Sequence, residues 1–177
     1  FELAKKQDRK KVTVVHKANI LRITDGLFLD IAKKISQSYP EIIMEDMLVD
    51  SCAMQLIKKT ESFDVIVTTN MFGDILSDEA AGLTGGLGVA ASGNIGNNQG
   101  LFESVHGSAP KYAGKNIANP TASFLSSAMM LEFLGENRAA KKIRNSVIKN
   151  IKLGLTTKDL GGRLKSSEFT DKVIKNL

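Results

Sequence analysis

Residues 64–88 read D-V-I-V-T-T-N-M-F-G-D-I-L-S-D-E-A-A-G-L-T-G-G-L-G. The run at 64–69 is apolar and β-branched, which predicts a short buried strand, and from residue 70 the apolar residues recur at helical spacing. A strand that leads directly into a helix is the repeating unit of α/β folds with a parallel sheet. This stretch therefore indicates the fold class of the chain.

Two aspartates on the predicted helix are candidates for a metal site. Asp74 and Asp78 are four residues apart, which puts their side chains on one helix face, about 5–6 Å apart at Cβ. Hard oxygen ligands at this separation suit Mg²⁺ or Mn²⁺. The alternative is a solvated face near a helix N-terminus, where the helix dipole favours acids. The D-x-x-x-D spacing by itself favours that alternative.

Two further strand–helix units precede this stretch. Residues 11–16 and 42–49 are short apolar runs typical of buried strands. Pro40 ends the helix predicted after the first strand, and Asp50 or Ser51 is expected to cap the helix after the second. These two predicted helices cover residues 20–38 and 50–59. The alternation predicts a mostly parallel sheet with flanking helices.

The composition changes after Ala80. Glycines crowd residues 82–100, which predicts a loop-rich stretch and a domain boundary near residue 85. Beyond it we expect a buried helix at 121–134, because this run is almost entirely apolar, and an amphipathic surface helix at 136–153. The remaining predicted features are a turn at Gly161-Gly162 and a closing helix at 168–177.

Composition excludes several classes of protein. Hydrophobic residues make up 42% of the 177 residues and charged residues 24%, as in ordinary soluble globular proteins. No apolar run reaches the roughly 18 residues that a membrane span requires, and no signal peptide opens the chain. The single cysteine, Cys52, excludes an intramolecular disulfide and fits a reducing cytosol. The net charge is +5, but the lysines are scattered and tryptophan is absent, so we expect no nucleic-acid partner.

Four segments resemble the β-decarboxylating dehydrogenases, the family of isocitrate, 3-isopropylmalate and homoisocitrate dehydrogenases. They are residues 70–88, 15–29 (V-H-K-A-N-I-L-R-I-T-D-G-L-F-L), 48–54 (L-V-D-S-C-A-M) and 101–120 (L-F-E-S-V-H-G-S-A-P-K-Y-A-G-K-N-I-A-N-P). The resemblance implies the α/β fold of that family, which is not a Rossmann fold, and the chain accordingly has no G-x-G-x-x-G.

The resemblance covers the C-terminal half of such an enzyme. Residue 1 is Phe, and residues 1–9 look like the end of an amphipathic helix, so we expect the chain to begin inside a longer protein. Residues 1 to about 84 would then belong to the small, dimerising subdomain. Residues from about 85 to 177 would be part of the large, cofactor-binding subdomain.

The resemblance also implies roles for individual residues. Lys17 matches a general acid/base that handles the proton of the decarboxylated enol, and Asn19 matches a contact to substrate or nicotinamide. A lysine can act in this way only if its surroundings bring its pKa toward neutrality. Asp50 matches a third metal carboxylate, donated across a homodimer to Asp74 and Asp78 of the other subunit.

The segment at 103–119 resembles the cofactor loop of the family. His106 matches the residue on which the adenine stacks, and residues 107–109 offer backbone amides near phosphate. Lys111 and Tyr112 resemble the pair that meets the 2′-phosphate of NADP, an anion suited to a cation. The tail at 156–162, T-T-K-D-L-G-G, resembles members that use NAD, so NAD stays possible. The implied cofactor residues are Glu103, His106, Gly107, Ser108, Ala109, Lys111, Tyr112 and Asn119.

The function implied is metal-dependent oxidative decarboxylation of a 2-hydroxy acid, from isocitrate to 2-oxoglutarate, as in the tricarboxylic acid cycle. The A-P-K-Y-A-G loop favours isocitrate, while 3-isopropylmalate and homoisocitrate stay open because the arginines and the loop that select the substrate are expected upstream. A non-catalytic regulatory subunit and a plain binding module are further alternatives, against which the retained lysine and aspartates argue. We expect the 177-residue chain alone to be inactive, and the enzyme to be cytoplasmic, with the mitochondrial matrix also possible.

Overall fold

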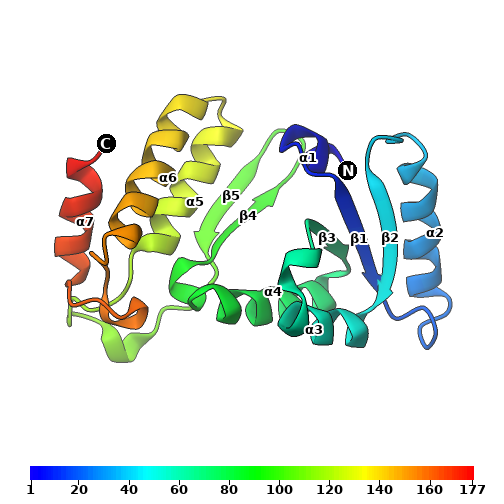
Figure 1. The fold of residues 1–177 in the computed structure, drawn as a ribbon, viewed down its shortest axis with the longest axis horizontal. Coiled ribbons are helices and arrows are strands. Elements are labelled where there is room, and N and C mark those ends of the chain that lie inside the picture. Colours follow the sequence, from blue (N-terminus) through cyan, green and yellow to red (C-terminus); the bar gives the residue numbers. More distant parts are fainter. The chain divides into compact units, whose positions relative to one another are not determined.

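The computed structural model describes all residues from Phe1 to Leu177. The chain divides into two compact units, Phe1–Ala80 and Ala81–Leu177, which we call unit 1 and unit 2 (Figure 1). Helix α4 (Asn70–Thr84) carries the chain from the first unit into the second. None of the helices combines the length and the apolar character that a membrane span requires.

Unit 1 contains a parallel three-stranded sheet in the order β2-β1-β3. The strands lie within the predicted runs, at Lys11–His16 (β1), Ile43–Leu48 (β2) and Val65–Thr68 (β3). His16 pairs with Leu48, and Val15 pairs with Thr68. The carboxyl ends of the three strands are therefore in register, and the residues that follow them emerge at one edge of the sheet.

Helices cover both faces of this sheet. Helices α1 (Glu2–Lys6) and α2 (Thr24–Ser36) contribute to a core around Val12 and Val14, while α3 (Val49–Lys58) and α4 contribute to a second core around Val15. Neighbouring residues of a strand point to opposite faces, so a central strand covered on both sides needs apolar residues throughout. The α/β fold with a parallel sheet and flanking helices is thus confirmed in this unit.

Two helix starts differ from their predictions. Helix α2 begins at Thr24 instead of residue 20, because residues 18–23 form a turn in which the Lys17 carbonyl accepts the N–H groups of Ile20 and Leu21 (2.9 and 2.8 Å). Helix α3 begins at Val49 after Leu48, without a side-chain cap. The predicted cap at Asp50 or Ser51 was wrong, since both residues already lie within the first turn.

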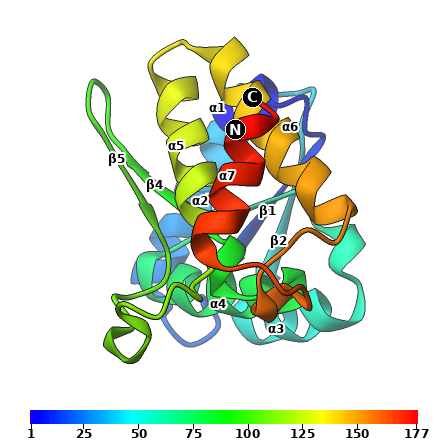
Figure 2. The same ribbon diagram turned by 90° about the vertical axis from the view of Figure 1, so that its left-hand side faces the viewer.

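Unit 2 begins with regular elements in a stretch that was predicted to be a loop because of its glycines. Helix α4 continues through Gly82 to Thr84, and an antiparallel hairpin of β4 (Ala91–Ile95) and β5 (Gly100–Ser104) lies within or beside the stretch predicted to be a loop. Figure 2 shows this hairpin beside α5. A Cβ on Gly93 or Gly100 would stand 3.0 or 2.6 Å from the Phe102 ring. These glycines therefore make room for a cross-strand aromatic ring.

Three helices complete unit 2: α5 (Thr121–Phe133), α6 (Asn137–Lys152) and α7 (Ser166–Lys175). Helix α6 packs against α5 and α7, and Val147, Phe169 and Val173 form the centre of their core. Helix α5 is less buried than its apolar composition predicts, because Met130 and the adjoining Leu134 remain exposed. The rest of this chain therefore covers only part of the apolar surface of α5.

Candidate active site and cofactor pocket

The predicted catalytic lysine lies at the carboxyl edge of the sheet of unit 1. Lys17 directly follows β1, and Asp50 lies in the first turn of α3, which directly follows β2. Because His16 pairs with Leu48 in the parallel ladder, these two residues meet, and the Lys17 Nζ donates to Oδ1 of Asp50. The Lys17 side chain is 26% exposed and that of Asp50 is 63% exposed. The pair is thus assembled within one chain and open to solvent on the carboxylate side.

The surroundings of Asp50 favour its charged form. The hydrogen bond from Lys17 lowers the pKa of the Asp50 carboxyl below its usual value, and the residue's own main-chain N–H lowers it further. Hydrogen bonds to the ionised form of an acid stabilise that form. Asp50 is therefore a carboxylate at neutral pH, as a metal ligand must be. Asn19, the other predicted site residue of this turn, is exposed two residues after Lys17.

The second pair of predicted metal ligands lies on α4. Asp74 and Asp78 occupy successive turns of this helix and both are exposed. No group of three or more histidines, cysteines or acids in the chain is placed to hold a metal ion. Asp50 therefore does not converge with Asp74 and Asp78 within one copy of the chain.

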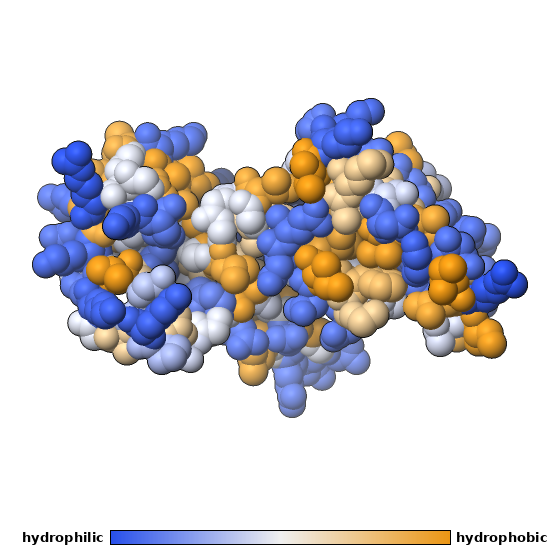
Figure 3. All heavy atoms as spheres, turned by 90° about the horizontal axis from the view of Figure 1, so that it is seen from below, coloured by the Kyte–Doolittle hydropathy of each residue, from blue (hydrophilic) through white to orange (hydrophobic).

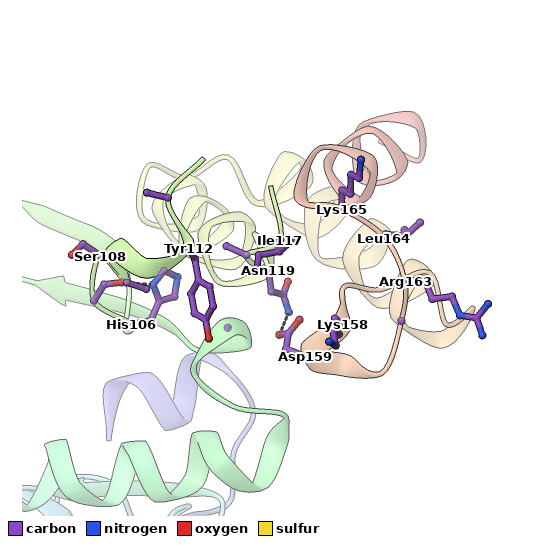
Figure 4. Close-up of a pocket in the computed structure, with 16 residues that line it drawn as sticks. His106, Ser108, Tyr112, Ile117, Asn119, Lys158, Asp159, Arg163, Leu164 and Lys165 are labelled. Carbon is purple, nitrogen blue, oxygen red and sulfur yellow. Dashed lines mark hydrogen bonds between the residues drawn. The ribbon is translucent and has the colours of Figure 1, made fainter. Parts of the chain in front are cut away.

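Unit 2 contains a cavity of about 1090 Å³ (Figure 4). Figure 4 places His106 and Tyr112 on one side of this cavity and the 158–165 segment on the other, with Asn119 and Asp159 facing each other between them. Six of the eight predicted cofactor residues line it: His106, Gly107, Ser108, Ala109, Tyr112 and Asn119. The segment that the sequence singled out therefore surrounds a space large enough for a dinucleotide-sized ligand.

The loop on the His106 side has a strained backbone. Ala109 adopts the left-handed conformation with φ of 41° and ψ of 60°, which a residue with a Cβ rarely occupies. This conformation redirects the chain into a short 3₁₀-helix at Pro110–Tyr112. Nδ1 of His106 donates to the carbonyl of Gly107 (2.9 Å), and both residues line the cavity. Strain of this kind clusters at ligand-binding loops.

A partly buried polar contact joins the two walls of the cavity. The Asn119 amide donates to Oδ2 of Asp159 (2.8 Å), while its Oδ1 accepts the N–H of Thr121 (3.0 Å). Thr157 donates a second hydrogen bond to Asp159 (2.5 Å). A Cβ on Gly88 would lie 3.0 Å from the Asp159 carboxylate and 3.2 Å from the Asn119 Cβ, so any larger residue there would press on both partners of this contact. The only acid lining the cavity is therefore already occupied by protein donors.

A model of the family described as isocitrate/isopropylmalate dehydrogenase matches residues 1–173. The chain belongs to this family. An isocitrate/homoisocitrate dehydrogenase of Thermus thermophilus is 53% identical over all of the chain. A homoisocitrate dehydrogenase of Methanocaldococcus jannaschii is 56% identical over 98% of it.

A solved structure supports the same assignment. The isocitrate dehydrogenase from Methylococcus capsulatus superposes with a TM-score of 0.95 at 49% identity, covering 99% of this chain and 52% of that one. The chain likewise covers 53% of the Thermus protein and 50% of the Methanocaldococcus protein. It thus spans about half the length of the curated relatives it matches.

Two predicted cofactor residues of this family member lie outside the cavity lining. Glu103 is on β5, where its carbonyl accepts a hydrogen bond from Ser126 (2.6 Å). Lys111 is not among the lining residues, but its Nζ lies over the Tyr112 ring, 5.3 Å from the ring centroid. A lysine can reach past an aromatic ring through its flexible stem, so Lys111 remains close to the cavity that Tyr112 lines.

Sequence reasoning missed the second wall of the cavity, which consists of Lys158, Asp159, Arg163, Leu164 and Lys165. Their segment was considered only as a marker of the cofactor used. A signal was available at the Gly161-Gly162 pair. A Cβ on Gly162 would stand 1.9 Å from the Thr156 carbonyl oxygen, so a glycine is obligatory in this fold of the loop. Figure 4 shows that the side chains of Arg163 and Lys165 extend away from the other labelled side chains, which leaves Lys158, beside Asp159, as the labelled cation nearest to Asn119.

Proposed function

We propose that the protein containing this chain catalyses the metal-dependent oxidative decarboxylation of a 2-hydroxy acid, with isocitrate as substrate and NADP as oxidant. The observation that carries the proposal is the contact between Lys17 and Asp50 at the carboxyl ends of two paired parallel strands. This edge is where α/β sheets place their site residues. Here it brings together a potential proton donor and a potential metal ligand.

The reaction requires a hydride acceptor, a Lewis acid and a proton carrier. Bound NADP would supply the acceptor for the hydride of C2, and a bound divalent cation would supply a Lewis acid for the hydroxyl and the developing carbonyl. The hydroxyl proton is released as the carbonyl forms, and it balances the proton that is added later to the enol. Loss of CO₂ from the resulting 2-oxo acid leaves an enol, and Lys17 delivers the proton that converts this enol to the product. Asn19, in the same turn, contributes a polar contact to substrate or nicotinamide.

The residues present fit a divalent cation, provided that two copies of the chain combine. Asp74 and Asp78 offer hard oxygen donors on one helix face, and Asp50 of a second copy supplies the third carboxylate. Exposed apolar residues flank the aspartates on α4, where Met71 is 62% and Ile75 is 59% exposed. Figure 3 shows apolar side chains at the surface on the side where Figure 1 places α3 and α4. We infer that a homodimer covers this face.

Three basic side chains support NADP as the cofactor. Lys158 and Lys165 line the cavity, and the Nζ of Lys111 lies over the ring of Tyr112. The single lining acid, Asp159, is bound by Asn119 and Thr157. A 2′-phosphate is a dianion whose contacts to cations are charge-assisted, so this balance favours NADP over NAD. Units 1 and 2 would correspond to parts of the dimerising and the cofactor-binding subdomains.

Steady-state kinetics of the full-length protein test the proposal. We expect Mn²⁺-dependent turnover with isocitrate and NADP, at a kcat/KM above that measured with 3-isopropylmalate or homoisocitrate. Relatives named for these three substrates match at 53 to 56% identity, so identity does not separate them, and the A-P-K-Y-A-G loop carries the preference. No turnover with any of the three would contradict the catalytic proposal and favour a regulatory subunit.

The 177-residue chain by itself should have no dehydrogenase activity. It brings together Lys17 and Asp50 but leaves Asp74 and Asp78 apart from them, and it covers about half of its relatives. Purified chain, assayed with isocitrate, Mn²⁺ and either NAD or NADP, should give the same rate as a metal-free control. A rate above that control would show that the catalytic residues of this chain suffice.

A further inference from the structure

We propose that Asp25 and His16 are positioning residues that fix the backbone of the turn at residues 17–19, which we call the lysine turn, and so direct Lys17 toward Asp50. The inference rests on the proposed role of Lys17 in proton transfer. Neither residue faces the space next to Asp50, because both use their side chains to bind main-chain N–H groups of the turn.

Asp25 holds the first N–H of the lysine turn. Its Oδ2 accepts the N–H of Lys17 at 2.6 Å, and the residue is only 4% exposed. The ladder between β1 and β2 ends at His16, so the Lys17 N–H has no strand partner and depends on this side chain. Asp25 is the second residue of α2, where the positive end of the helix dipole stabilises a carboxylate. A buried charge without such partners would be costly.

His16 holds the second N–H of the same turn. Its Nδ1 accepts the N–H of Ala18 (3.1 Å), and the side chain is buried with the residue 5% exposed. A ring nitrogen that accepts a hydrogen bond carries no proton, so the proton is on Nε2, which donates to Oδ2 of Asp46 (3.1 Å). The other oxygen of Asp46 lies 3.9 Å from Nζ of Lys33 on α2. The orientation of the imidazole is thus set from β2 and α2.

Together these contacts leave the lysine turn little freedom. Two consecutive main-chain N–H groups are each bound by a buried side chain from a different direction, which fixes the direction of the Lys17 Cα–Cβ bond. If either acceptor is removed, the freed N–H must turn toward water, and the side chain of Lys17 turns with it. Proton transfer is sensitive to such movement, since a misplacement of about 1 Å costs on the order of 100-fold in rate.

Matched substitutions in the full-length protein separate positioning from other effects. Asp25→Asn keeps an oxygen that can accept the Lys17 N–H, whereas Asp25→Ala removes it. His16→Asn keeps an acceptor near the Nδ1 position, whereas His16→Gln keeps a polar contact to Asp46 but leaves the Ala18 N–H without a partner. We expect the Ala and Gln variants to lose about 100-fold in kcat with KM changed less than about threefold. The two Asn variants should stay within about tenfold of the parent.

Amide hydrogen exchange gives a readout that does not depend on activity. Exchange of the Lys17 and Ala18 N–H groups should accelerate selectively in Asp25→Ala and His16→Gln. If Asp25→Ala does not fold, Asp25→Glu serves in its place, because it keeps the charge but displaces the oxygens, and its kcat should also fall. Folded Ala, Gln or Glu variants with the parental kcat would overturn the proposal. An inactive parent enzyme would instead refute the proposed function, while the exchange data would still test whether these side chains hold the turn.

Discussion

The two units differ in the sign of their net charge and in the share of their charged residues that form ion pairs. Unit 1 has eleven lysines and arginines against thirteen acids, a net charge of −2, while unit 2 has thirteen against six, a net charge of +7. Seven of the eight ion pairs lie within unit 1, and the eighth joins Arg144 to Glu132 in unit 2. Half of the charged residues of unit 1 therefore lie in ion pairs within that unit, whereas most cations of unit 2 have no acid partner.

This difference corresponds to the two ligands that we propose. Exposed ion pairs contribute little to stability, so those of unit 1 matter more for the placement of groups such as Lys17 and Asp50. The acids that remain unpaired there include Asp74 and Asp78, which suit a cation. Around the cavity of unit 2, lysines outnumber the single occupied acid, which suits an anion. In the proposed function, the acids of unit 1 would thus bind the metal and the cations of unit 2 would bind the nucleotide.

The largest effect is expected at the unpaired acids of unit 1. Asp74→Asn in the full-length protein should lower kcat on the order of 1000-fold, because the metal site loses a charged ligand while the exposed position leaves the fold intact. Isothermal titration with Mn²⁺ and circular dichroism separate the two effects. Asp30→Asn, the same change at an exposed residue of α2, is the matched control. Activity within a few-fold of the parent at saturating Mn²⁺ would show that Asp74 is not a metal ligand.

A smaller effect is expected at the cations of unit 2. Lys111→Gln should reduce the preference for NADP over NAD by about tenfold to a hundredfold, since a hydrogen bond to a charged group is worth roughly 1.5–3 kcal/mol. The ratio of kcat/KM for the two cofactors measures the change. Lys115→Gln, at an exposed lysine that does not line the cavity, should leave the ratio unchanged. A parent protein that prefers NAD would mean that Lys111 is a surface residue.

Acid should weaken unit 1 before unit 2. The N–H groups of Lys10 and Lys11, together with Arg9, lower the pKa of Asp64 below its usual value. A carboxyl whose pKa is lower in the folded state adds stability above its unfolded pKa of about 3.9, and this contribution is lost as the pH falls through the folded pKa.

Residue-resolved hydrogen exchange, followed as the pH falls from about 5 to about 2, should therefore show protection lost first in β1 and β3. Asp64→Asn should flatten this pH dependence, because the titrating group is gone while an acceptor oxygen remains. Equal loss in α5 and α6 over the same range would contradict the assignment of acid sensitivity to unit 1.

The smallest effect is a lack of reaction at Cys52. Burial raises the pKa of this thiol to about 11, with a further contribution from the charge of Glu79. The thiolate is the reactive form of cysteine, so iodoacetamide at about pH 8 should leave Cys52 unmodified in the folded protein and label it after unfolding in urea. Mass spectrometry detects the adduct. Rapid labelling of the folded protein would show that the core between α3 and the sheet opens readily.

Local pattern predicted the elements of unit 1 better than those of unit 2. Strands β1 to β3 were predicted correctly because a sheet with a core on each face needs apolar residues at successive positions. Such short apolar runs can be recognised in the sequence. The hairpin β4–β5 was missed because its glycines accommodate the Phe102 ring, a contact between residues on different strands. The predicted start of α2 was wrong for a different reason, because residues 18–23 form a turn in which the Lys17 carbonyl accepts N–H groups.

The sequence by itself determined the alternation of strands and helices, the family resemblance and most of the residues around the cavity. Short motifs and the period of the apolar residues are properties of neighbouring positions in the chain, so they can be recognised without the structure. Only the tertiary structure decided that Lys17 meets Asp50, that Asp25 and His16 hold the lysine turn, and that Lys158 and Lys165 line the cavity. These contacts depend on strand order, register and loop closure between distant residues. Local periodicity carries no information about which distant segments become neighbours.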